Sequence, residues 1–549
     1  MSFCRLDCDQ ATETHTGTQH SYAGEMSGAE RRRRAAAAAG GVAAAVLGAG
    51  VGELIATLFA PPSSPFAVVG GALIDAAPAW AKDTAIAWFG TADKIALLIG
   101  IAVVLLIASA VAGLCERRWP RAGMIAFAVI GVAVGILALT RPDAGALAWL
   151  PSVLAGAIAA TAVRMLASML PASVPTPTAT QTPTATATAT AGGGMARRRF
   201  LLWAGGSAAV GVAMALAGSL ARAGSSAVTV VREAIRLPRP ATPADAAPAG
   251  AALDVPGLSP LFTPNRDFYR IDTALIVPAV DPGQWRLRVH GMVANEVELT
   301  WDELLALPLI ETAVTLSCVS NPVGGDLVGN AMWLGYPIRE LLARAKPDAD
   351  ADMVLSTSVD GFTAGTPLEA LTDERDALLA IGMNGEPLPF AHGFPVRMVV
   401  PGLYGYVSAT KWVTDLEVTR FDRARAYWTD RGWSARGPIK LQSRIDVPRS
   451  GARISPGDAV IAGVAWQPGS GVSGVEVQVD DGPWQPATLA PAISDDTWVQ
   501  WRMPWTAEPG EHVLRCRAID AGGTPQTSAS APPAPDGATG WHTVTINVE

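Results

Sequence analysis

The N-terminal part of the chain alternates between long apolar stretches and short segments that carry charge. Five stretches reach the roughly 20 residues that a membrane-spanning helix needs, and they occupy residues 35–60, 95–114, 122–140, 147–170 and 200–221. Buried helices of a soluble protein seldom lack charge over such a length. We therefore predict four membrane-spanning helices within residues 35–170 and a fifth after them. Their many Ala and Gly residues suit close helix–helix contact in lipid.

Arginines cluster in alternate segments between the expected helices. They precede the first helix at residues 31–34, separate the second from the third at Arg117, Arg118 and Arg121, and precede the fifth at residues 197–199. Because positive charge stays on the cytoplasmic side, we expect a cytoplasmic tail over residues 1–34 and an extracytoplasmic part over residues 222–549. The pattern predicts a multi-pass protein of the plasma membrane, with the lipid bilayer as a partner.

Two ionisable residues lie inside the expected helices, Glu53 and Arg164. Each either marks a proton or quinone path or lies near a helix end, from which a long side chain reaches the membrane interface. The sequence leaves both interpretations open.

The fifth helix lies between two segments that are too rich in Ala, Pro and Thr to build a core. We expect these segments, residues 171–194 and 223–256, to be linkers, and the polar residues 1–30 to be disordered. Residues 195–222 carry three arginines at residues 197–199, followed by Phe200 and Leu201, which resembles a twin-arginine export signal. Such a signal is read by a receptor, whereas the alternative is an ordinary cationic flank of a membrane helix.

From residue 257 the pattern becomes that of a soluble domain. Residues 285–289 alternate as a strand does, and residues 396–400 form an apolar strand that ends at a Pro-Gly turn. Thr300 followed by Glu303 predicts a capped helix, and residues 339–345 are typical of a second short helix. These elements predict an α+β domain over residues 257–425, which is large enough for its own core.

The last part of the chain consists of short alternating segments separated by Gly, Pro and Asp. Asp480-Asp481-Gly482 is typical of a hairpin turn. The pattern predicts an immunoglobulin-like β-sandwich over residues 426–549, so the chain as a whole is expected to be a multi-domain protein with an N-terminal α-helical membrane region. The predicted strands are residues 459–466, 472–479, 498–503, 512–518 and 541–548.

A single cysteine, Cys318, lies where an apolar run gives way to a turn that contains Pro322 and Gly324. A thiolate at the mouth of a domain is a soft ligand for a metal. Taken alone, such a cysteine is more often a small buried side chain, which is how we interpret Cys516 on a predicted strand. The segments around Cys318 favour the metal.

An ordered series of short motifs surrounds Cys318. It comprises Asn265-Arg266-Asp267-Phe268-Tyr269, Trp285-Arg286-Leu287, Met383-Asn384-Gly385, His392-Gly393-Phe394-Pro395-Val396-Arg397 and Lys411-Trp412. Over residues 257–549 this series resembles the sulfite oxidase family of molybdopterin enzymes. The resemblance implies a sulfite-oxidase-type molybdopterin domain, a Mo-molybdopterin cofactor, and a C-terminal domain through which such enzymes commonly form homodimers.

The resemblance also assigns roles to residues. Cys318 is implied as the molybdenum ligand and as a catalytic residue, and His392 and Arg397 as the pair that contacts the phosphate of the pterin. An arginine offers a planar fork to such an anion. The other cofactor contacts that the resemblance implies are Asn265, Tyr269, Asp360, Ser408, Thr410 and Lys411.

The substrate side departs from the family pattern. Sulfite-oxidising members carry arginines where this chain has Pro322-Val323 and Pro264. A sulfite dianion needs several fixed cations, so we expect sulfite to be a poor substrate. Arg266, Tyr404 and Arg431 are expected to act with Cys318 in catalysis. Tyr406 and Trp428 are further candidates, and the aromatic cluster at residues 427–433 either lines a pocket or packs between domains.

These features predict a membrane-anchored, externally facing oxidoreductase that carries out two-electron oxygen-atom transfer on a small sulfur- or nitrogen-oxide substrate. The chain has no Cys-x-x-Cys-His haem motif and no iron–sulfur cysteine set, so a separate cytochrome or quinone-linked carrier is expected to take the electrons. No nucleic acid is expected as a partner. The alternative is a membrane receptor or transporter-like protein whose outer domain binds a ligand without catalysis.

Overall fold

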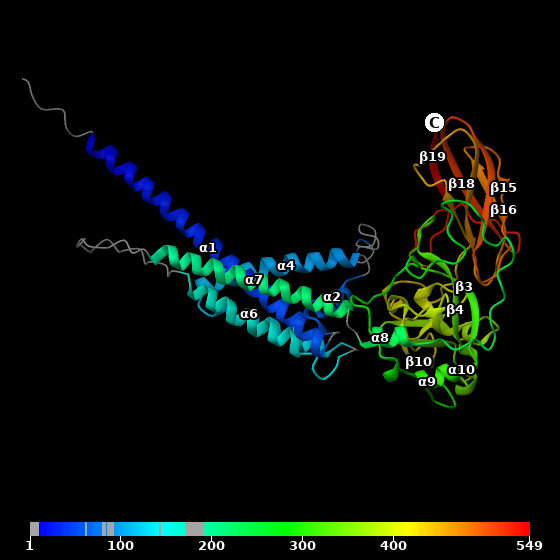
Figure 1. The fold of residues 1–549 in the computed structure, drawn as a ribbon, viewed down its shortest axis with the longest axis horizontal. Coiled ribbons are helices and arrows are strands. Elements are labelled where there is room, and N and C mark those ends of the chain that lie inside the picture. The colour runs from blue at the N-terminus through cyan, green and yellow to red at the C-terminus, as the bar shows by residue number, and fades with distance from the viewer. Residues whose placement is uncertain are drawn as a thin grey trace, which may run out of the picture. The chain divides into compact units, whose positions relative to one another are not determined.

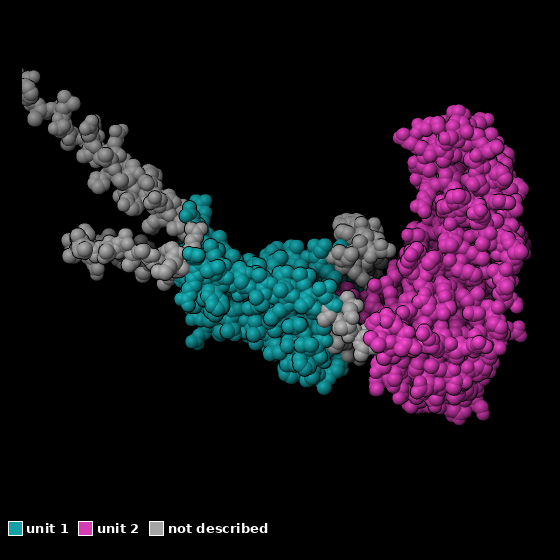
Figure 2. Space-filling view, viewed as in Figure 1, with its two compact units in different colours: residues 1–226 teal, residues 227–549 magenta. Residues whose placement is uncertain are grey.

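The structure, a computed structural model, describes residues 10–60, 63–78, 84, 93–141, 144–170, 192–224 and 227–549. The chain divides into two compact units, residues 1–226 and residues 227–549, drawn in teal and magenta in Figure 2. Unit 1 is helical, whereas unit 2 is built mainly from β-strands (Figure 1).

Unit 1 contains apolar helices of bilayer length. Within the described residues, five helices are long and apolar enough to cross a membrane, and they confirm the five predicted helices. A helix that begins at Gln10 also replaces the disorder expected there, whereas residues 1–9 and most of the first expected linker, residues 171–191, lie outside the described residues. The five apolar stretches lie in α1 (Gln10–Phe59), α4 (Asp93–Arg118), α5 (Ala122–Leu139), α6 (Leu150–Ser168) and α7 (Gly192–Gly224), and α2 (Pro65–Ala76) is shorter.

Glycines let the helices of unit 1 approach one another closely. Helix α1 packs against α4, α6 and α7. A Cβ atom added to Gly41 would lie 2.1 Å from the carbonyl oxygen of Ser109 on α4, and one added to Gly50 would lie 2.1 Å from that of Gly211 on α7. No side chain larger than hydrogen fits at these crossings, which is the packing that lipid-embedded helices favour.

Both ionisable residues that were expected inside the helices have polar partners. Glu53 is 5% exposed, and its carboxylate accepts a hydrogen bond of 2.5 Å from Ser64, the N-cap residue of α2. Arg164 forms an ion pair of 3.2 Å with Glu116, a buried residue that also accepts hydrogen bonds from the backbone at the start of α5. Unit 1 thus holds its internal charges by specific contacts.

The first part of unit 2 contains two sheets. One has the order β2-β1-β10-β5-β6, in which only β1 and β10 run parallel, and the other has the order β3-β4-β7-β8 with β9 also paired to β7. The strands of the first are β1 (Arg286–Gly291), β2 (Val297–Thr300), β5 (Met353–Ser358), β6 (Thr363–Pro367) and β10 (Val413–Thr419). Those of the second are β3 (Ile310–Ser317), β4 (Val328–Pro337), β7 (Leu378–Met383), β8 (Glu386–Pro387) and β9 (Arg397–Val399).

Three short helices complete this α+β part, α9 (Trp301–Ala306), α10 (Ile338–Ala345) and α11 (Glu369–Thr372). The predicted cap of α9 is confirmed, because Thr300 accepts from the Glu303 amide at 3.2 Å while the Glu303 carboxylate accepts from the Thr300 amide at 2.8 Å. The other predicted helix corresponds to α10, and the two predicted strands correspond to β1 and β9.

The second part of unit 2, here called the two-sheet domain, comprises the strands from β11 to β19. Its sheets have the orders β11-β13-β17-β16 and β12-β19-β18-β14-β15, and residues of both enclose one core around Trp501, Leu514 and Cys516. All five predicted strands are present, and the predicted hairpin joins β14 to β15. The strands are β11 (Gln442–Val447), β12 (Arg453–Ile454), β13 (Gly457–Trp466), β14 (Val472–Val479), β15 (Gln485–Pro486), β16 (Thr488–Leu489), β17 (Val499–Ala507), β18 (Gly510–Asp520) and β19 (His542–Val548).

Residues 227–256, which were expected to belong to a linker, pack along unit 2. They begin with helix α8 (Ala227–Ala234), on which Arg232 donates a hydrogen bond of 2.7 Å to the carbonyl oxygen of Leu388. Farther along, the amide of Ala241 donates to the carbonyl oxygen of Leu309 at 2.8 Å. Backbone and side-chain hydrogen bonds therefore order a segment whose composition alone suggested a linker without fixed structure.

Candidate active site

A pocket in unit 2 collects most of the residues that the sequence singled out. Its walls come from the loop before β1, the turn after β3, the β5–β6 connection, the segments that carry η4 (Phe390–His392), β9 and η5 (Gly405–Val407), and the stretch after β10 that carries η6 (Thr429–Arg431). The wall residues are Phe268, Tyr269, Ile271, Asp272, Thr273, Cys318, Val319, Ser320, Ser358, Asp360, Phe362, His392, Arg397, Gly405, Tyr406, Ala409, Lys411, Trp412, Trp428 and Trp433.

Cys318 follows directly after strand β3 and reaches the pocket with only 8% of its surface exposed. Its amide donates to the carbonyl oxygen of Leu327 at 2.9 Å, and its own carbonyl accepts from the amide of Asn321 at 3.1 Å. Burial raises the pKa of the thiol, although hydrogen bonds from Ser320 and the charge of Lys411 oppose that shift. The backbone therefore holds the sulfur at a fixed place on the wall.

The two-sheet domain supports the strand that delivers Cys318. The amide of Thr315 on β3 donates to the carbonyl oxygen of Asp496 at 3.0 Å, and the Thr315 hydroxyl accepts from the amide of Trp498 at 2.8 Å. Strand β3 is thus held by hydrogen bonds to the two-sheet domain as well as by those within its own sheet.

The two-sheet domain also holds the turn after Cys318. Arg444 donates to the carbonyl oxygen of Gly325 at 2.8 Å while it forms an ion pair of 2.6 Å with Asp446. The ring of His542 lies against Gly324, where an added Cβ would be 2.1 Å from the ring carbon Cδ2. The domain therefore fixes the turn on both sides of the Gly324–Gly325 peptide.

A cluster of basic residues, here called the cation cluster, lies on the pocket wall and consists of His392, Arg397 and Lys411. Arg397 donates to the carbonyl oxygen of His392 at 3.2 Å, and Arg397 and Lys411 form a backbone bridge. Gly393 lies between them at φ 111°, where an added Cβ would be 2.9 Å from that of Arg397. Only glycine gives the chain this close turn without strain.

Burial sets the protonation of the cation cluster. It lowers the pKa of His392 to about 4, with help from the nearby charge of Arg397, so the ring is neutral at pH 7. It also lowers the pKa of Lys411 to about 8, although the charge of Asp272 opposes the shift. The Asp272 carboxylate lies 2.8 Å from the Lys411 ammonium and 2.9 Å from the Arg270 guanidinium.

The cation cluster fits an anionic group such as a phosphate. Arg397 is 5% exposed, and its Nε and Nη1 donate to backbone carbonyls. Within the described part of the chain, its Nη2 has no hydrogen-bond acceptor. A buried guanidinium with a donor turned to a cavity is a favourable partner for an oxyanion.

The pocket also fits a metal that brings ligands of its own. No group of three or more His, Cys, Asp or Glu side chains within the described residues is arranged to hold a metal ion. A metal at Cys318 would therefore draw its remaining ligands from a cofactor or from solvent. A thiol and an anion site on one pocket wall match a cofactor that carries both a metal and a phosphate.

The structure does not bring every expected cofactor residue to the wall. Tyr269 and Asp360 lie on it, and burial raises the pKa of the Tyr269 hydroxyl far above its usual range. Asn265 is not among the wall residues, and its carbonyl oxygen lies 3.0 Å from the Nε2 atom of His392. Ser408 and Thr410 are fully buried, and their hydroxyls bind Tyr404 and Ser356 in the core.

The expected catalytic residues other than Cys318 lie off the wall. The Arg266 side chain is 87% exposed and pairs with Asp267. Arg431 lies 3.6 Å over the ring of Tyr427. Tyr404 is 3% exposed, and burial raises the pKa of its hydroxyl to about 12.

Sequence reasoning gave no role to three wall residues that bear on chemistry, namely Asp272, Ser320 and Phe362, whereas Trp433 belongs to the aromatic cluster that it did single out. Asp272 and Phe362 each lie within two or three residues of a residue that had been singled out. That proximity was the available signal, because neighbours in a loop often share a pocket.

Comparison with known proteins agrees with this chemistry. A family model described as "Oxidoreductase molybdopterin binding domain" matches residues 274–428. Sulfite oxidase from Gallus gallus is 30% identical over 320 residues, an alignment that covers 49% of this chain and 69% of that enzyme. The mitochondrial sulfite oxidase of Homo sapiens is 30% identical over 321 residues, covering 49% of this chain and 58% of the human enzyme. This chain thus spans less than two thirds of the human protein.

One solved structure is also similar in part. The sulfane dehydrogenase SoxCD from Paracoccus pantotrophus aligns with a TM-score of 0.46 and 22% sequence identity, covering 55% of this chain and 86% of that chain.

Proposed function

Because this chain belongs to the sulfite oxidase family, it is a molybdenum-cofactor oxidoreductase that uses Mo-molybdopterin, and we propose that it catalyses two-electron oxygen-atom transfer on a small sulfur- or nitrogen-oxide substrate. The observation that carries this proposal is the presence of the Cys318 thiol and the cation cluster on the walls of one pocket. The bound cofactor supplies two-electron chemistry that amino-acid side chains cannot perform.

Different residues of the pocket hold different parts of that cofactor. Cys318 supplies the thiolate ligand, and Arg397 and Lys411 bind the phosphate, with Tyr269 and Asp360 as further contacts. His392, which is neutral at pH 7, takes part through hydrogen bonding. Asn265, Ser408 and Thr410 act indirectly, because they orient His392 and the segment that carries Lys411.

Unit 1 is proposed to anchor the enzyme in the plasma membrane, with unit 2 outside the cytoplasm. The five long apolar helices support the anchoring, and the positions of the arginine clusters support the orientation. The two-sheet domain is proposed to be immunoglobulin-like and to mediate a homodimer. A separate cytochrome or quinone-linked carrier is proposed to exchange electrons with the site.

The proposal is tested by metal content and turnover in the full chain, purified in detergent from a host that makes the cofactor. Plasma mass spectrometry should find close to one molybdenum per chain, and a dye-coupled assay should detect turnover. Cys318→Ser should abolish turnover and leave the fold intact, because serine offers a harder oxygen donor. Cys516→Ser, a change in the core of the two-sheet domain, is the control.

Full activity in the Cys318→Ser protein would disprove the role of that residue. Absence of both molybdenum and turnover from the unaltered protein would favour an outer domain that binds a ligand without catalysis.

A further inference from the structure

One side of the pocket is formed by aromatic rings. Phe362, Tyr406, Trp428 and Trp433 all lie on the wall, and we call them the aromatic wall. Tyr406 lies 5.9 Å from Trp433 and Trp433 lies 6.1 Å from Trp428, measured between ring centroids. Tyr427 links Phe362 to Trp428, at 5.9 Å and 5.2 Å respectively. Ring contacts therefore connect all four residues of the aromatic wall, with Tyr427 joining Phe362 to Trp428 from off the pocket wall.

The loop that carries the two tryptophans is rigid. The amides of Arg431 and Trp433 both donate to the carbonyl oxygen of Trp428, at 2.9 and 3.2 Å, and Gly432 between them has φ 94°. The amide of Tyr427 donates to the Thr363 hydroxyl at 3.0 Å, which ties the loop to β6. Such a preorganised surface binds a flat apolar molecule with little loss of conformational entropy.

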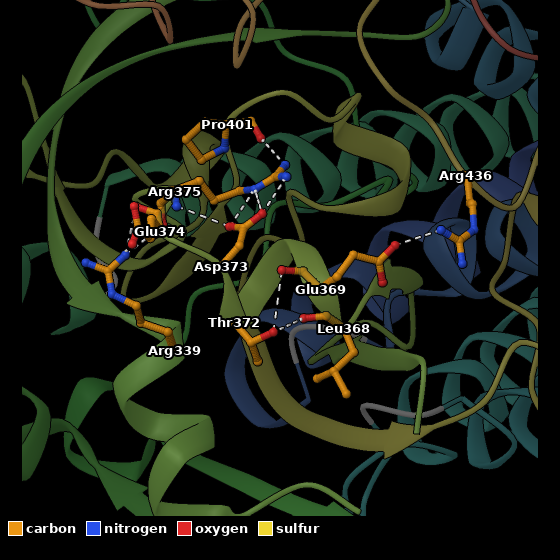
Figure 3. A network of polar contacts seen from close by, with 9 residues as sticks. All are labelled: Arg339, Leu368, Glu369, Thr372, Asp373, Glu374, Arg375, Pro401 and Arg436. Atoms are coloured by element: carbon orange, nitrogen blue, oxygen red, sulfur yellow. Dashed lines mark hydrogen bonds and ion pairs between the residues drawn. The ribbon is translucent and has the colours of Figure 1, made fainter. Parts of the chain in front are cut away.

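Figure 3 shows a network of polar contacts that joins Arg436 to Glu369 and Arg375 to Pro401. Arg436, just after the aromatic loop, pairs with Glu369 on α11 at 2.7 Å. Arg375 donates to the carbonyl oxygen of Pro401 at 3.0 Å, and Pro401 begins the segment that leads to Tyr406. Two of the three chain segments that supply rings to the wall are thus bound to the connection between β6 and β7, and the third, which carries Phe362, leads directly into β6.

The charges on the pocket wall cancel. The side chains that carry positive charge at pH 7 among the described wall residues are Arg397 and Lys411, and the carboxylates are Asp272 and Asp360. Two positive and two negative groups give a formal charge of zero, since His392 is neutral at pH 7. Once both cations bind the cofactor phosphate, the wall has no further cation to offer a dianionic substrate.

Three further arginines of this part of the chain have their contacts elsewhere. The Arg266 side chain is 87% exposed, and Arg431 is stacked on Tyr427 and donates to its carbonyl oxygen at 2.8 Å. Arg270 is on the exposed side of Asp272, with 41% of its side chain accessible. None of these three arginines lies on the described pocket wall, and Arg431, which stacks on Tyr427 beside it, is already engaged with that residue.

Trp433 adds a neutral hydrogen-bond donor to the aromatic wall. The residue lines the pocket, and across the ranges that the structure describes its indole N–H has no acceptor. The Tyr406 hydroxyl, in contrast, donates to the carbonyl oxygen of Ser434 at 2.7 Å. Tyr406 therefore offers the pocket its ring and not its hydroxyl group. A neutral donor beside apolar faces suits the oxygen of an uncharged dipolar group.

We infer that the substrate is an uncharged organic S-oxide or N-oxide with a planar apolar body, or the reduced partner of such a compound, and that its body lies on the aromatic wall with its oxygen facing the Trp433 indole. This inference rests on the proposed function. In the reducing direction the heteroatom–oxygen bond breaks, the heteroatom accepts two electrons that the separate electron carrier supplies, and the oxygen leaves as water with two protons. In the oxidising direction water supplies the oxygen, the heteroatom–oxygen bond forms, two electrons pass to the carrier and two protons are released.

The test compares substrates on the full chain in detergent, after molybdenum per chain has been measured. Methyl phenyl sulfoxide and pyridine N-oxide are assayed with a reduced dye as electron donor, and dimethyl sulfoxide serves as the analogue without a ring. Sulfite is assayed with an oxidised dye. The KM of an aryl oxide should be at least tenfold below that of dimethyl sulfoxide, and kcat/KM for sulfite should be lower than for the aryl oxide.

Variants separate ring stacking from hydrogen bonding. Trp428→Ala should raise the KM for the aryl oxide about tenfold, in line with the loss of one stacking ring. Trp433→Phe should raise it several-fold for the oxide and leave binding of methyl phenyl sulfide unchanged, because only the oxide can accept from the indole. Trp484→Ala is the matched control, since Trp484 is also packed against a tryptophan, Trp541, but lies in the two-sheet domain.

Binding is measured independently of turnover by calorimetric titration of each protein with methyl phenyl sulfoxide. Efficient oxidation of sulfite that the tryptophan variants do not alter would overturn the inference while the proposed function stands. No turnover at full molybdenum occupancy would instead contradict the proposed function. Calorimetry would then still decide whether the aromatic wall binds the aryl oxide, and no detectable binding would overturn the inference.

Discussion

Arg397 is a buried cation that the protein itself satisfies only in part. Burial lowers the pKa of its guanidinium to about 10, and the ring of Trp333 lies beneath it, with the guanidinium carbon 5.1 Å from the ring centroid. Two of its nitrogens donate to backbone carbonyls. Taking such a group out of water is costly unless an anion compensates for it, so the residue is best explained by the phosphate that we propose it binds.

Arg397→Ala is therefore expected to reduce molybdenum occupancy more than turnover per bound metal. Hydrogen bonds to a charged partner are each worth roughly 1.5–3 kcal/mol, which corresponds to at least a tenfold loss of cofactor affinity. Plasma mass spectrometry measures occupancy, and the dye-coupled rate is divided by it. Arg339→Ala serves as control, because Arg339 binds carbonyl oxygens of Glu374 and Arg375 away from the pocket. Unchanged occupancy in Arg397→Ala would remove this arginine from the phosphate site.

The sequence could identify the residues of the cation cluster but not the direction in which their neighbours point. His392, Arg397 and Lys411 came from short motifs, and all three lie on the wall. Thr410 came from the same reasoning, yet its hydroxyl lies 2.7 Å from that of Ser356 in the core. Linear spacing does not show which face of an irregular segment meets a cavity, because that depends on strands that are distant in the sequence.

At the scale of elements, β3 and the turn after it depend on the two-sheet domain. The turn holds Gly324 at φ 75°, against the ring of His542. The sequence showed a Pro/Gly turn at this place but not its partner, since His542 begins a strand more than two hundred residues later.

Gly324→Ala is expected to destabilise unit 2 by about 2–4 kcal/mol, because the new methyl group meets the His542 ring in addition to the cost of a positive φ. Gly451→Ala is the matched control. Gly451 has φ 77° but no atom within 4 Å of an added Cβ, so this change should cost only about 1 kcal/mol. Denaturant unfolding of the full chain in detergent measures both.

Combining Gly324→Ala with His542→Ala should cost less than the sum of the two single changes by more than about 1 kcal/mol. Additive effects would show that the Gly324 turn and the His542 ring do not interact.

Asp496, whose carbonyl oxygen accepts from Thr315, carries a carboxyl group with an unusual pKa. Burial, and secondarily the charge of Asp376, raises that pKa from 3.8 to about 6. A pKa that is higher in the folded state means that the folded protein binds the proton more tightly. The ionised group therefore costs stability above pH 6, and that cost disappears as the pH falls towards 4.

Asp496→Asn should stabilise the protein at pH 8 and have almost no effect at pH 4. The gain should be on the order of 1–2 kcal/mol, because the group is only partly buried and solvent screens its charge. The backbone bond to Thr315 is kept in this variant. Thermal unfolding at the two pH values tests the prediction, with Asp481→Asn, a change at a fully exposed residue of the two-sheet domain, as control. Equal effects at both pH values would show that ionisation of Asp496 is not the cause.

At the scale of the whole molecule, apolar length predicted the helices of unit 1 well, because the thickness of a bilayer sets a minimum that few other structures meet. The helical residues 10–29 were missed, since a polar segment without an apolar face gives no helical periodicity. Helix α8 was missed because eight residues are too few for a reliable pattern. Arg232 holds this helix in place through hydrogen bonds to the segment between β7 and β9, which is distant in the sequence.

The proposed placement of unit 2 outside the cytoplasm depends on the start of α7, where two interpretations of the arginines differ in what they require. A cationic flank acts through charge and should accept lysine, whereas an export signal is read by a receptor that distinguishes the residues themselves. We expect Arg197→Lys/Arg198→Lys to leave the first four helices inserted and to retain unit 2 in the cytoplasm. Protease added to intact spheroplasts should then digest unit 2 in the unaltered protein and spare it in the variant.

Arg117→Lys/Arg118→Lys, between the second and third apolar helices, is the matched control and should leave unit 2 accessible. Equal digestion of unit 2 in the Arg197→Lys/Arg198→Lys variant would show that positive charge alone orients the fifth helix. In that case the cofactor would have to be inserted after unit 2 had crossed the membrane unfolded, and molybdenum occupancy would depend on cofactor supply outside the cytoplasm.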